Sequence, residues 1–120
     1  MARQRFPQSV YSQGEEPDAR FTLANERTFL AWIRTALALM AGGVALEALS
    51  LGLQPGFQLG ASVILMLTGI LSPLQAWFGW ARNERALRNN TPLPSPMLAL
   101  PVVIAVAVAG LLVLLGLVLR

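Results

Sequence analysis

The residues best suited to chemistry in this sequence are two arginines, Arg27 and Arg34, in the stretch ANERTFLAWIRTALALMAGG at residues 24–43. Arginine carries a permanent charge and a planar fork of N–H donors that matches carboxylate and phosphate groups. All nine basic residues are arginine, and they outnumber the six acidic residues. This pattern is compatible with an anionic partner, but a genome rich in arginine, alanine, leucine and glycine codons accounts for the composition more simply.

Chemistry that depends on cysteine or histidine is excluded, because the chain contains neither residue. Disulfides, haem attachment and zinc sites built on these side chains are excluded with it. The acids and arginines form no convergent set of base, nucleophile and stabilising group. We therefore predict that the protein is not an enzyme, has no metal site or cofactor, and does not bind nucleic acid.

Arg27 and Arg34 are seven residues apart, so on a helix they share one face, about 20° apart around the axis. The small residues of the span continue this face: Ala31, Ala38, Ala41, Gly42 and Ala45. In a membrane, small side chains mark the places where another helix approaches closely. We therefore predict that residues 38, 41, 42 and 45 are helix-packing residues, and that both arginines point toward a protein interior or a water-filled cleft.

Two other accounts of the arginines stay open. The long Arg34 side chain could snorkel back to the lipid headgroups. Alternatively, Glu26 or Glu84 could neutralise Arg27 or Arg34, since such pairs are a usual way to keep charges in a membrane bundle. Glu84 and Arg88 are also spaced as an i,i+4 pair on a helix surface.

Three apolar runs must position these residues: about 29–53, 57–80 and 97–119. The chain is 55% hydrophobic and 12% charged, and each run exceeds the ~20 residues that cross a bilayer as helix. We predict an all-α membrane protein with three transmembrane helices in a domain covering 18–120. Asp18 or Thr22 can cap the first helix, the second continues through ARNERALR, and residues 1–17 form a mobile polar tail.

The arginines also predict the orientation. Four precede the first span and three follow the second, whereas only Arg120 lies beyond the third. Basic residues favour the cytoplasmic side, so we predict a cytoplasmic N-terminus and an outside C-terminus. The three tryptophans fall at the cytoplasmic ends of their helices, where an aromatic belt is expected.

The stretch ANERTFLAWIRTALALMAGGVAL, followed by a second span and a basic segment, resembles the YidH-type inner-membrane proteins, the family of domain of unknown function 202. Over the same three helices, from about Asp18 to Leu119, the chain is similar to the membrane domain of the vacuolar transporter chaperone. That complex makes polyphosphate and passes it across a membrane. The resemblance implies a multi-pass protein of the bacterial inner membrane.

The resemblance also implies a pentamer with an anion path lined by basic residues of the first two helices. By motif position, Arg20 and Arg27 match those of the first helix, and Glu26 matches the acid beside them. For the second helix the match is open between Arg82 and Arg85. We expect the protein to lack the polymerase and phosphate-sensing domains of that complex, and therefore not to make polyphosphate itself. Arg34 lies deeper than the shared motif.

Two functions fit the arginine face and the family resemblance. One is a homo-oligomeric channel or conduit for anions, with phosphate or polyphosphate as candidates and an arginine-lined cytoplasmic mouth. The other is a structural membrane subunit that stabilises or recruits a partner protein, with the arginines in salt bridges. The lack of an uninterrupted polar stripe across the membrane favours the second.

Overall fold

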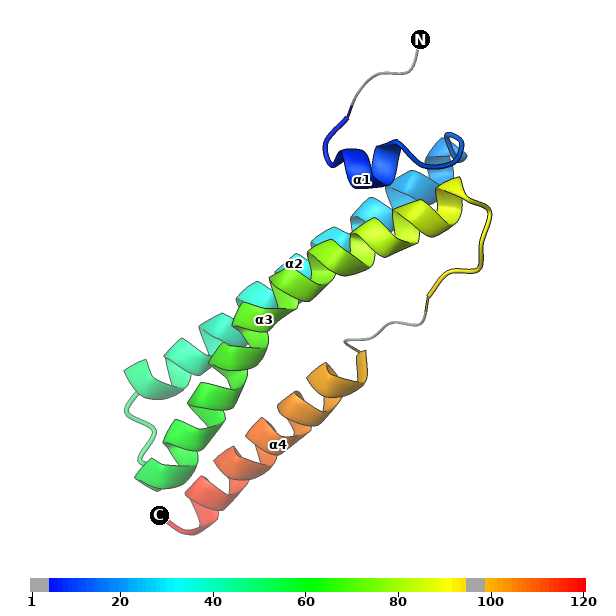
Figure 1. Cartoon of the computed structure of the whole chain (residues 1–120). Helices are drawn as coiled ribbons and strands as arrows, with labels where there is room; N and C mark the ends of the chain where they lie inside the picture. The colour runs from blue at the N-terminus through cyan, green and yellow to red at the C-terminus, as the bar shows by residue number, and fades with distance from the viewer. Residues whose placement is uncertain (1–4, 95–98) are drawn as a thin grey trace.

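The computed structural model describes residues 5–94 and 99–120. They form four helices: α1 (Gln8–Tyr11), α2 (Ala19–Ala48), α3 (Pro55–Arg88) and α4 (Ala99–Val118). In Figure 1, α2 and α3 run antiparallel, and α4 lies along the N-terminal half of α3, which begins at Pro55. The short helix α1 lies at the opposite end of α3. Among the described residues, α3 contacts both other long helices, whereas α2 and α4 do not touch.

The three long helices are each long and apolar enough to cross a membrane, which confirms the predicted all-α fold with three spans. The bounds differ from the prediction at the first span. α2 ends at Ala48 rather than near residue 53, because the chain turns at Gly52, whose φ of +69° suits glycine. The predicted start of the third span, at residues 97–98, lies outside the described residues.

The helix ends follow from local sequence. Asp18 caps α2, since its Oδ1 accepts a hydrogen bond from the Arg20 N–H at 2.9 Å. Gln54 caps α3 by accepting from the Phe57 N–H at 3.0 Å, and Pro55 occupies the first turn. α3 ends before Asn90, which adopts a positive φ of 54°. Asp18 as the start of the first helix, and the continuation of the second through Arg88, are therefore confirmed.

Small residues bring α2 and α3 into close contact. A Cβ atom on Gly69 would lie 2.6 Å from Met40 Cγ and 3.0 Å from the Ala36 carbonyl oxygen. A Cβ on Gly43 would lie 2.9 Å from Met66 Cγ and 3.0 Å from a backbone oxygen of α3. Each helix thus supplies one glycine on which the other helix rests, as close packing in membranes requires.

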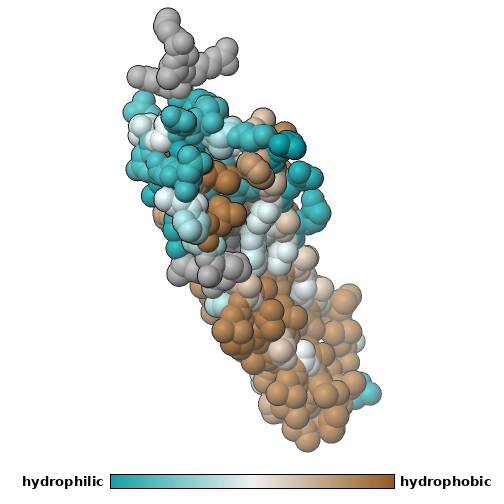
Figure 2. Space-filling view, turned by 90° about the vertical axis from the view of Figure 1, so that its right-hand side faces the viewer, coloured by the Kyte–Doolittle hydropathy of each residue, from teal (hydrophilic) through white to brown (hydrophobic). Residues whose placement is uncertain are grey.

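The helix lengths show how the molecule sits in a bilayer. α4 has 20 residues and spans about 30 Å, the thickness of the hydrocarbon core. α3 has 34 residues and extends about 20 Å further at the end where α1 lies. In Figure 2 the surface at that end is hydrophilic and the rest is largely hydrophobic. The polar end of the α2–α3 hairpin therefore projects out of the membrane.

Of residues 1–17, predicted to form a mobile polar tail, the structure describes residues 5–17, and residues 1–4 lie outside the described part. Residues 5–17 fold onto the projecting end of α3, with Val10 fully buried and the Glu15 N–H donating to the Arg88 carbonyl at 2.9 Å. Gly14 has a φ of +60°, and a Cβ there would lie 2.2 Å from the Arg88 carbonyl oxygen. The segment is held because it covers apolar surface and bonds the end of α3.

Candidate functional site

Arg27 and Arg34 lie on the face of α2 that points away from α3. The residues of α2 buried in the structure are Asn25, Ala36, Leu39 and Gly43. Arg27 follows Asn25 by two residues, about 200° around the helix, and Arg34 follows it by nine, about 180° after whole turns. Both arginines are exposed in the single chain. We call this surface of Arg27, Arg34, Ala38 and Ala41 the arginine face.

The predicted helix-packing residues lie on or beside the same surface. Ala38 and Ala41 are exposed, and Gly42 and Ala45 are half-buried. A Cβ on Gly42 would meet only Leu65 Cδ1, at 3.6 Å. Within the chain, α2 and α3 instead meet through the neighbouring face that carries Gly43. Packing of residues 38, 41, 42 and 45 against another copy stays a prediction.

The two arginines lie at different depths. Ala48 ends α2, and Arg34 lies 14 residues before it, about 21 Å along the helix. With Ala48 at one border of a hydrocarbon core of about 30 Å and α2 along the membrane normal, Arg27 lies about 32 Å from that end and therefore at the opposite border. Arg34 is therefore about 9 Å inside the border.

Arg20 lies beyond the membrane border and is paired within its own helix end. Its Nη2 is 3.0 Å from Asp18 Oδ2, and its Nε donates to Asp18 Oδ1 at 3.3 Å. These hydrogen bonds lower the pKa of the Asp18 carboxyl below its ordinary value. Arg20 is exposed, and it therefore remains accessible to an anion only in competition with Asp18.

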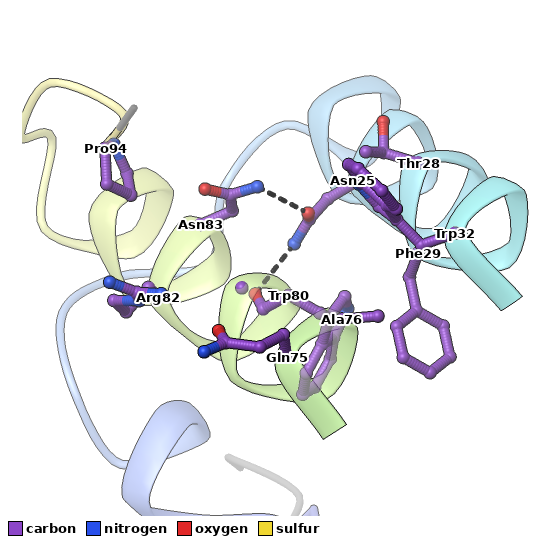
Figure 3. Close-up of a pocket in the computed structure, with 11 residues that line it drawn as sticks. Asn25, Thr28, Phe29, Trp32, Gln75, Ala76, Trp80, Arg82, Asn83 and Pro94 are labelled. Atoms are coloured by element: carbon purple, nitrogen blue, oxygen red, sulfur yellow. Dashed lines mark hydrogen bonds between the residues drawn. The ribbon is translucent and has the colours of Figure 1, made fainter. Parts of the chain in front are cut away.

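The arginines of α3 occupy different surroundings. Arg82 is half-buried and lines a small pocket of about 60 Å³ beside Asn25 and Asn83, shown in Figure 3. Arg85 is also half-buried, and its Nε makes no hydrogen bond within residues 5–94 and 99–120. Because Arg27 and Arg34 face away from α3, the single chain does not gather the four arginines into one site.

A polar link that the sequence analysis missed joins α2 to α3 at this pocket. Asn25 is 7% exposed, and its Nδ2 donates to the Trp80 carbonyl oxygen at 3.0 Å. Asn83 Nδ2 donates in turn to Asn25 Oδ1 at 3.2 Å, as Figure 3 shows. The sequence signal for this link was Asn25 itself, because asparagine disfavours helix interiors and yet lies inside the helical ANERTF stretch.

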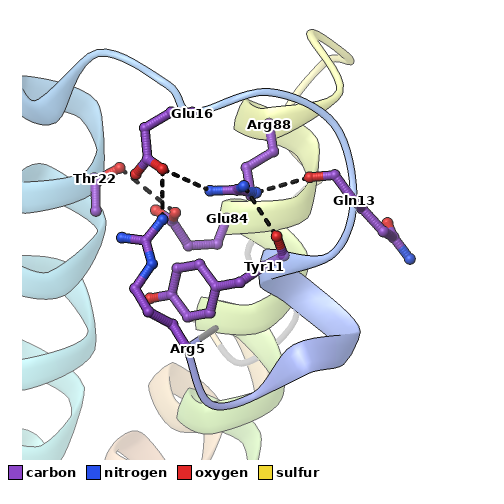
Figure 4. Close-up of polar contacts among 7 residues, drawn as sticks. All are labelled: Arg5, Tyr11, Gln13, Glu16, Thr22, Glu84 and Arg88. Atoms are coloured by element: carbon purple, nitrogen blue, oxygen red, sulfur yellow. Dashed lines mark hydrogen bonds and ion pairs between the residues drawn. The ribbon is translucent and has the colours of Figure 1, made fainter. Parts of the chain in front are cut away.

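A second polar cluster lies where the N-terminal segment meets α3, and Figure 4 shows it. Arg88 is 6% exposed. Its Nε donates to the Gln13 carbonyl at 2.8 Å and its Nη2 to the Tyr11 carbonyl at 3.0 Å. The predicted surface pair of Glu84 and Arg88 is wrong, because both side chains are buried and the N-terminal segment supplies the partners of Arg88.

Glu16 and Glu84, the two acids of this cluster, differ in exposure and in the partners that they have. Glu16 accepts a hydrogen bond from Arg5 and lies 3.6 Å from Arg88 Nη1. The bond from Arg5, more than the nearby charges, lowers the pKa of Glu16 below its ordinary 4.5. Glu84 is 1% exposed; its Oε2 accepts a long hydrogen bond of 3.5 Å from Thr22 Oγ1. Its Oε1 has no partner among the described residues.

Glu26 and Glu84, the predicted salt-bridge partners, do not pair with Arg27 or Arg34 inside the chain. Among residues 5–94 and 99–120 the ion pairs are Arg5–Glu16, Arg20–Asp18 and Arg88–Glu16.

Comparison with known proteins identifies the family to which the chain belongs. Residues 20–86 match a family described as "Domain of unknown function (DUF202)". The chain belongs to this family. It is 42% identical over 114 residues to the inner membrane protein YidH of Escherichia coli K12, a match covering 86% of this chain and 95% of that relative. This confirms the YidH-type resemblance.

A second relative is more similar over a shorter stretch. The chain is 50% identical over 80 residues to an uncharacterized protein of Mycobacterium tuberculosis H37Rv, and the match covers 66% of each chain. No solved structure gives a significant match. The likeness to YidH and the three apolar helices together show that this DUF202 protein is a multi-pass inner membrane protein.

Proposed function

We propose that this DUF202 protein assembles as a homo-oligomer and conducts anions past Arg27 and Arg34. The observation that carries the proposal is that Arg34 is exposed on a face of α2 that the chain itself leaves uncovered. Its distance of 14 residues from the end of α2 at Ala48 corresponds to a depth of about 9 Å inside the membrane border. A charged side chain at that depth is costly in contact with lipid and usually faces a bundle interior or water. Packing between copies along the arginine face would supply such an interior.

The small side chains above the arginines support this arrangement. Ala38 and Ala41 are exposed in the single chain and allow another helix to approach closely. Copies packed there would place Arg27 and Arg34 in stacked rings, and rings of charged side chains select ions by electrostatics. A pentamer is the assembly that the sequence resemblance to the vacuolar transporter chaperone suggests, and phosphate or polyphosphate is the anion that it suggests.

The arginine asymmetry assigns the mouth of this path to the cytoplasm. Arg82 and Arg85 lie on the part of α3 that projects beyond the membrane, where they would add positive charge around the entrance. The N-terminus is then cytoplasmic and the C-terminus outside. A topology reporter fused after Arg120 is expected on the outer side; a cytoplasmic signal would contradict this orientation.

Anion flux through purified protein in liposomes tests the function. Arg27→Glu reverses the charge of one ring and is expected to abolish anion flux or invert its selectivity. Arg27→Lys keeps the charge but loses the fork, so flux should persist with weaker phosphate binding. Arg34→Ala should reduce flux if that side chain faces the path and change little if it snorkels.

Arg120→Glu is the matched control, since it makes the same charge change at the other end of the molecule. Native mass spectrometry should confirm that each variant still assembles. Wild-type protein that assembles and passes neither chloride nor phosphate would contradict the channel.

A structural subunit is the second candidate. It is favoured by the apolar character of the arginine face above Arg34, where Ala38 and Ala41 give no continuous polar path. In that case acids of a partner protein would pair with the arginines. Intact assembly without flux, together with loss of a copurifying protein in Arg27→Glu, would support this candidate.

A further inference from the structure

A pocket that the anion path does not use lies between the N-terminal segment, α2 and α3. Its volume is about 390 Å³, and Glu26 is the charged residue that lines it. The aromatic residues of its wall come from all three parts of the chain: Phe6, Tyr11, Phe29, Trp77 and Trp80. We call these five residues the aromatic cage.

The rings of the cage support one another. Trp77 stacks on Trp80 with centroids 5.2 Å apart, and Phe29 meets Trp77 edge-on at 6.3 Å. Phe6 stacks on the same Trp77 ring at 6.3 Å, and Tyr11 lies 6.2 Å from Trp80. These separations are those of interacting aromatic pairs. The docked N-terminal segment therefore completes a wall that α2 and α3 begin.

Two acidic side chains lie at the aromatic cage, one lining the pocket and one beside Tyr11. Glu26 makes no hydrogen bond or ion pair within the part of the chain that the structure describes. Glu84 lies beside Tyr11 in Figure 4, buried and with Oε1 unpartnered. Burial, and then the charge of Glu84, raise the pKa of Tyr11, so this ring stays neutral.

One ring of the cage already makes a cation–π contact within the chain. The Arg5 guanidinium lies 4.3 Å from the Tyr11 ring centroid, within the range of a cation–π contact. Arg5 is engaged by Glu16, and Arg88 by backbone carbonyls and Glu16. Neither arginine neutralises Glu26.

We propose that the aromatic cage and Glu26 bind an ammonium group. Aromatic ring faces attract ammonium ions through the ring quadrupole, and a carboxylate at the rim supplies the opposite charge. Trp77 lies 22 residues after Pro55, about 33 Å along α3 and therefore at headgroup depth. The shared chemistry fits the ethanolamine headgroup of a phospholipid or a free small amine.

Tryptophan fluorescence tests the proposal directly. In a Trp32→Phe background only Trp77 and Trp80 remain as tryptophans, so the emission reports on the cage. Titration of the purified protein in detergent with tetramethylammonium chloride or ethanolamine hydrochloride should give a saturable change, and sodium chloride at equal ionic strength should not. Glu26→Gln should weaken the binding by about three- to tenfold.

Two matched variants separate binding from folding. Glu15→Gln makes the same charge change on an exposed residue outside the pocket and should leave the affinity unchanged. Trp77→Leu keeps apolar bulk but removes the central ring; Trp80 emission should then show little or no binding. Circular dichroism should show unchanged helix content in each variant.

Lipid binding distinguishes the two sources of the ammonium group. Native mass spectrometry of protein exchanged into mixed phosphatidylethanolamine and phosphatidylglycerol should show ethanolamine lipid retained by wild type and lost by Trp77→Leu, if the headgroup is the ligand. Saturable binding of amines without lipid retention assigns a free amine. No saturable response to either amine and no lipid preference would overturn the proposal, leaving the tryptophans as membrane anchors only.

Discussion

The two faces of α2 differ in whether the single chain supplies their packing partners. The face toward α3 carries Asn25, Ala36 and Gly43, and all three are buried against groups of the same chain. The opposite face carries Arg27 and Arg34, which are exposed in the single chain. One face is therefore complete at the level of the single chain, and the other requires something outside it.

The difference lies in the kind of residue that each face uses near the membrane border. Asn25 donates a hydrogen bond to the Trp80 carbonyl and accepts one from Asn83, and these bonds compensate its burial. Arg34 carries five donors, and the described residues offer it no acidic partner. A polar group with internal partners holds the fold together, whereas one without them points to assembly or function.

Two adjacent glycines give the largest expected contrast between the faces. Gly43→Leu would push side-chain atoms into Met66 and the α3 backbone, and we expect a loss of about 3 kcal/mol or more in hairpin stability. Gly42→Leu should change this stability by less than about 0.5 kcal/mol but weaken the oligomer.

Unfolding in dodecyl sulfate, followed by circular dichroism, measures the first effect, and native mass spectrometry measures the second. Equal behaviour of the two variants would remove the distinction between the faces.

The asparagine link gives an effect of intermediate size. Asn25→Ala removes the partner of both Asn83 and the Trp80 carbonyl, and we expect it to destabilise the hairpin by about 1–3 kcal/mol. Thr28→Ala is the control, because Thr28 is exposed and its hydroxyl bonds only to its own helix. The same unfolding assay applies; a control variant as unstable as Asn25→Ala would show that the link is not specific.

The smallest expected effect is a dependence of the docking of the N-terminal segment on pH. This segment is a further surface that, like the α3-facing side of α2, finds its hydrogen-bond partners inside the chain. The pKa of Glu16 is lowered below 4.5 in the folded protein. Its contribution to docking is therefore present above pH 4.5 and is lost as the pH falls through the lower folded value. Asp18, whose pKa is also lowered, titrates in the same direction.

The amide signal of Glu15, hydrogen-bonded to Arg88, reports this docking in nuclear magnetic resonance spectra. We expect it to move toward its unstructured position as the pH falls from 6 to 3. Glu16→Gln should shift it toward that position already at pH 6. A signal that is independent of both changes would mean that Glu16 does not hold the segment.

The fold was predictable from sequence because long apolar runs and capping residues are local signals. The three spans, the cap at Asp18 and the extension of the second helix through Arg88 all follow from composition and spacing. The docked segment was not predictable in this way. Its polar composition indicates mobility, whereas its order depends on carbonyl groups that meet Arg88 from a distant part of the chain.

The candidate site was predictable only in part for the same reason. Helical spacing placed Arg27 and Arg34 on one face, but it could not show which face α3 covers. That choice depends on the adjacent glycines Gly42 and Gly43, of which only Gly43 meets the α3 backbone closely. The buried state of Glu84 was equally hidden, because it depends on neighbours far away in the sequence, Thr22 of α2 and Tyr11 of the docked segment.

The contacts of Arg88 have a consequence for the order in which the molecule is made. The carbonyl groups of Tyr11 and Gln13 leave the ribosome first, and Arg88 follows them by 77 and 75 residues. They can meet only after α2 has crossed the bilayer and α3 has returned, since both ends must then lie in the same compartment. If the second span failed to cross, Arg88 would lie on the opposite side of the membrane from the N-terminal segment. The N-terminal segment can therefore dock only on an α2–α3 hairpin that has inserted with both of its ends on the same side of the membrane.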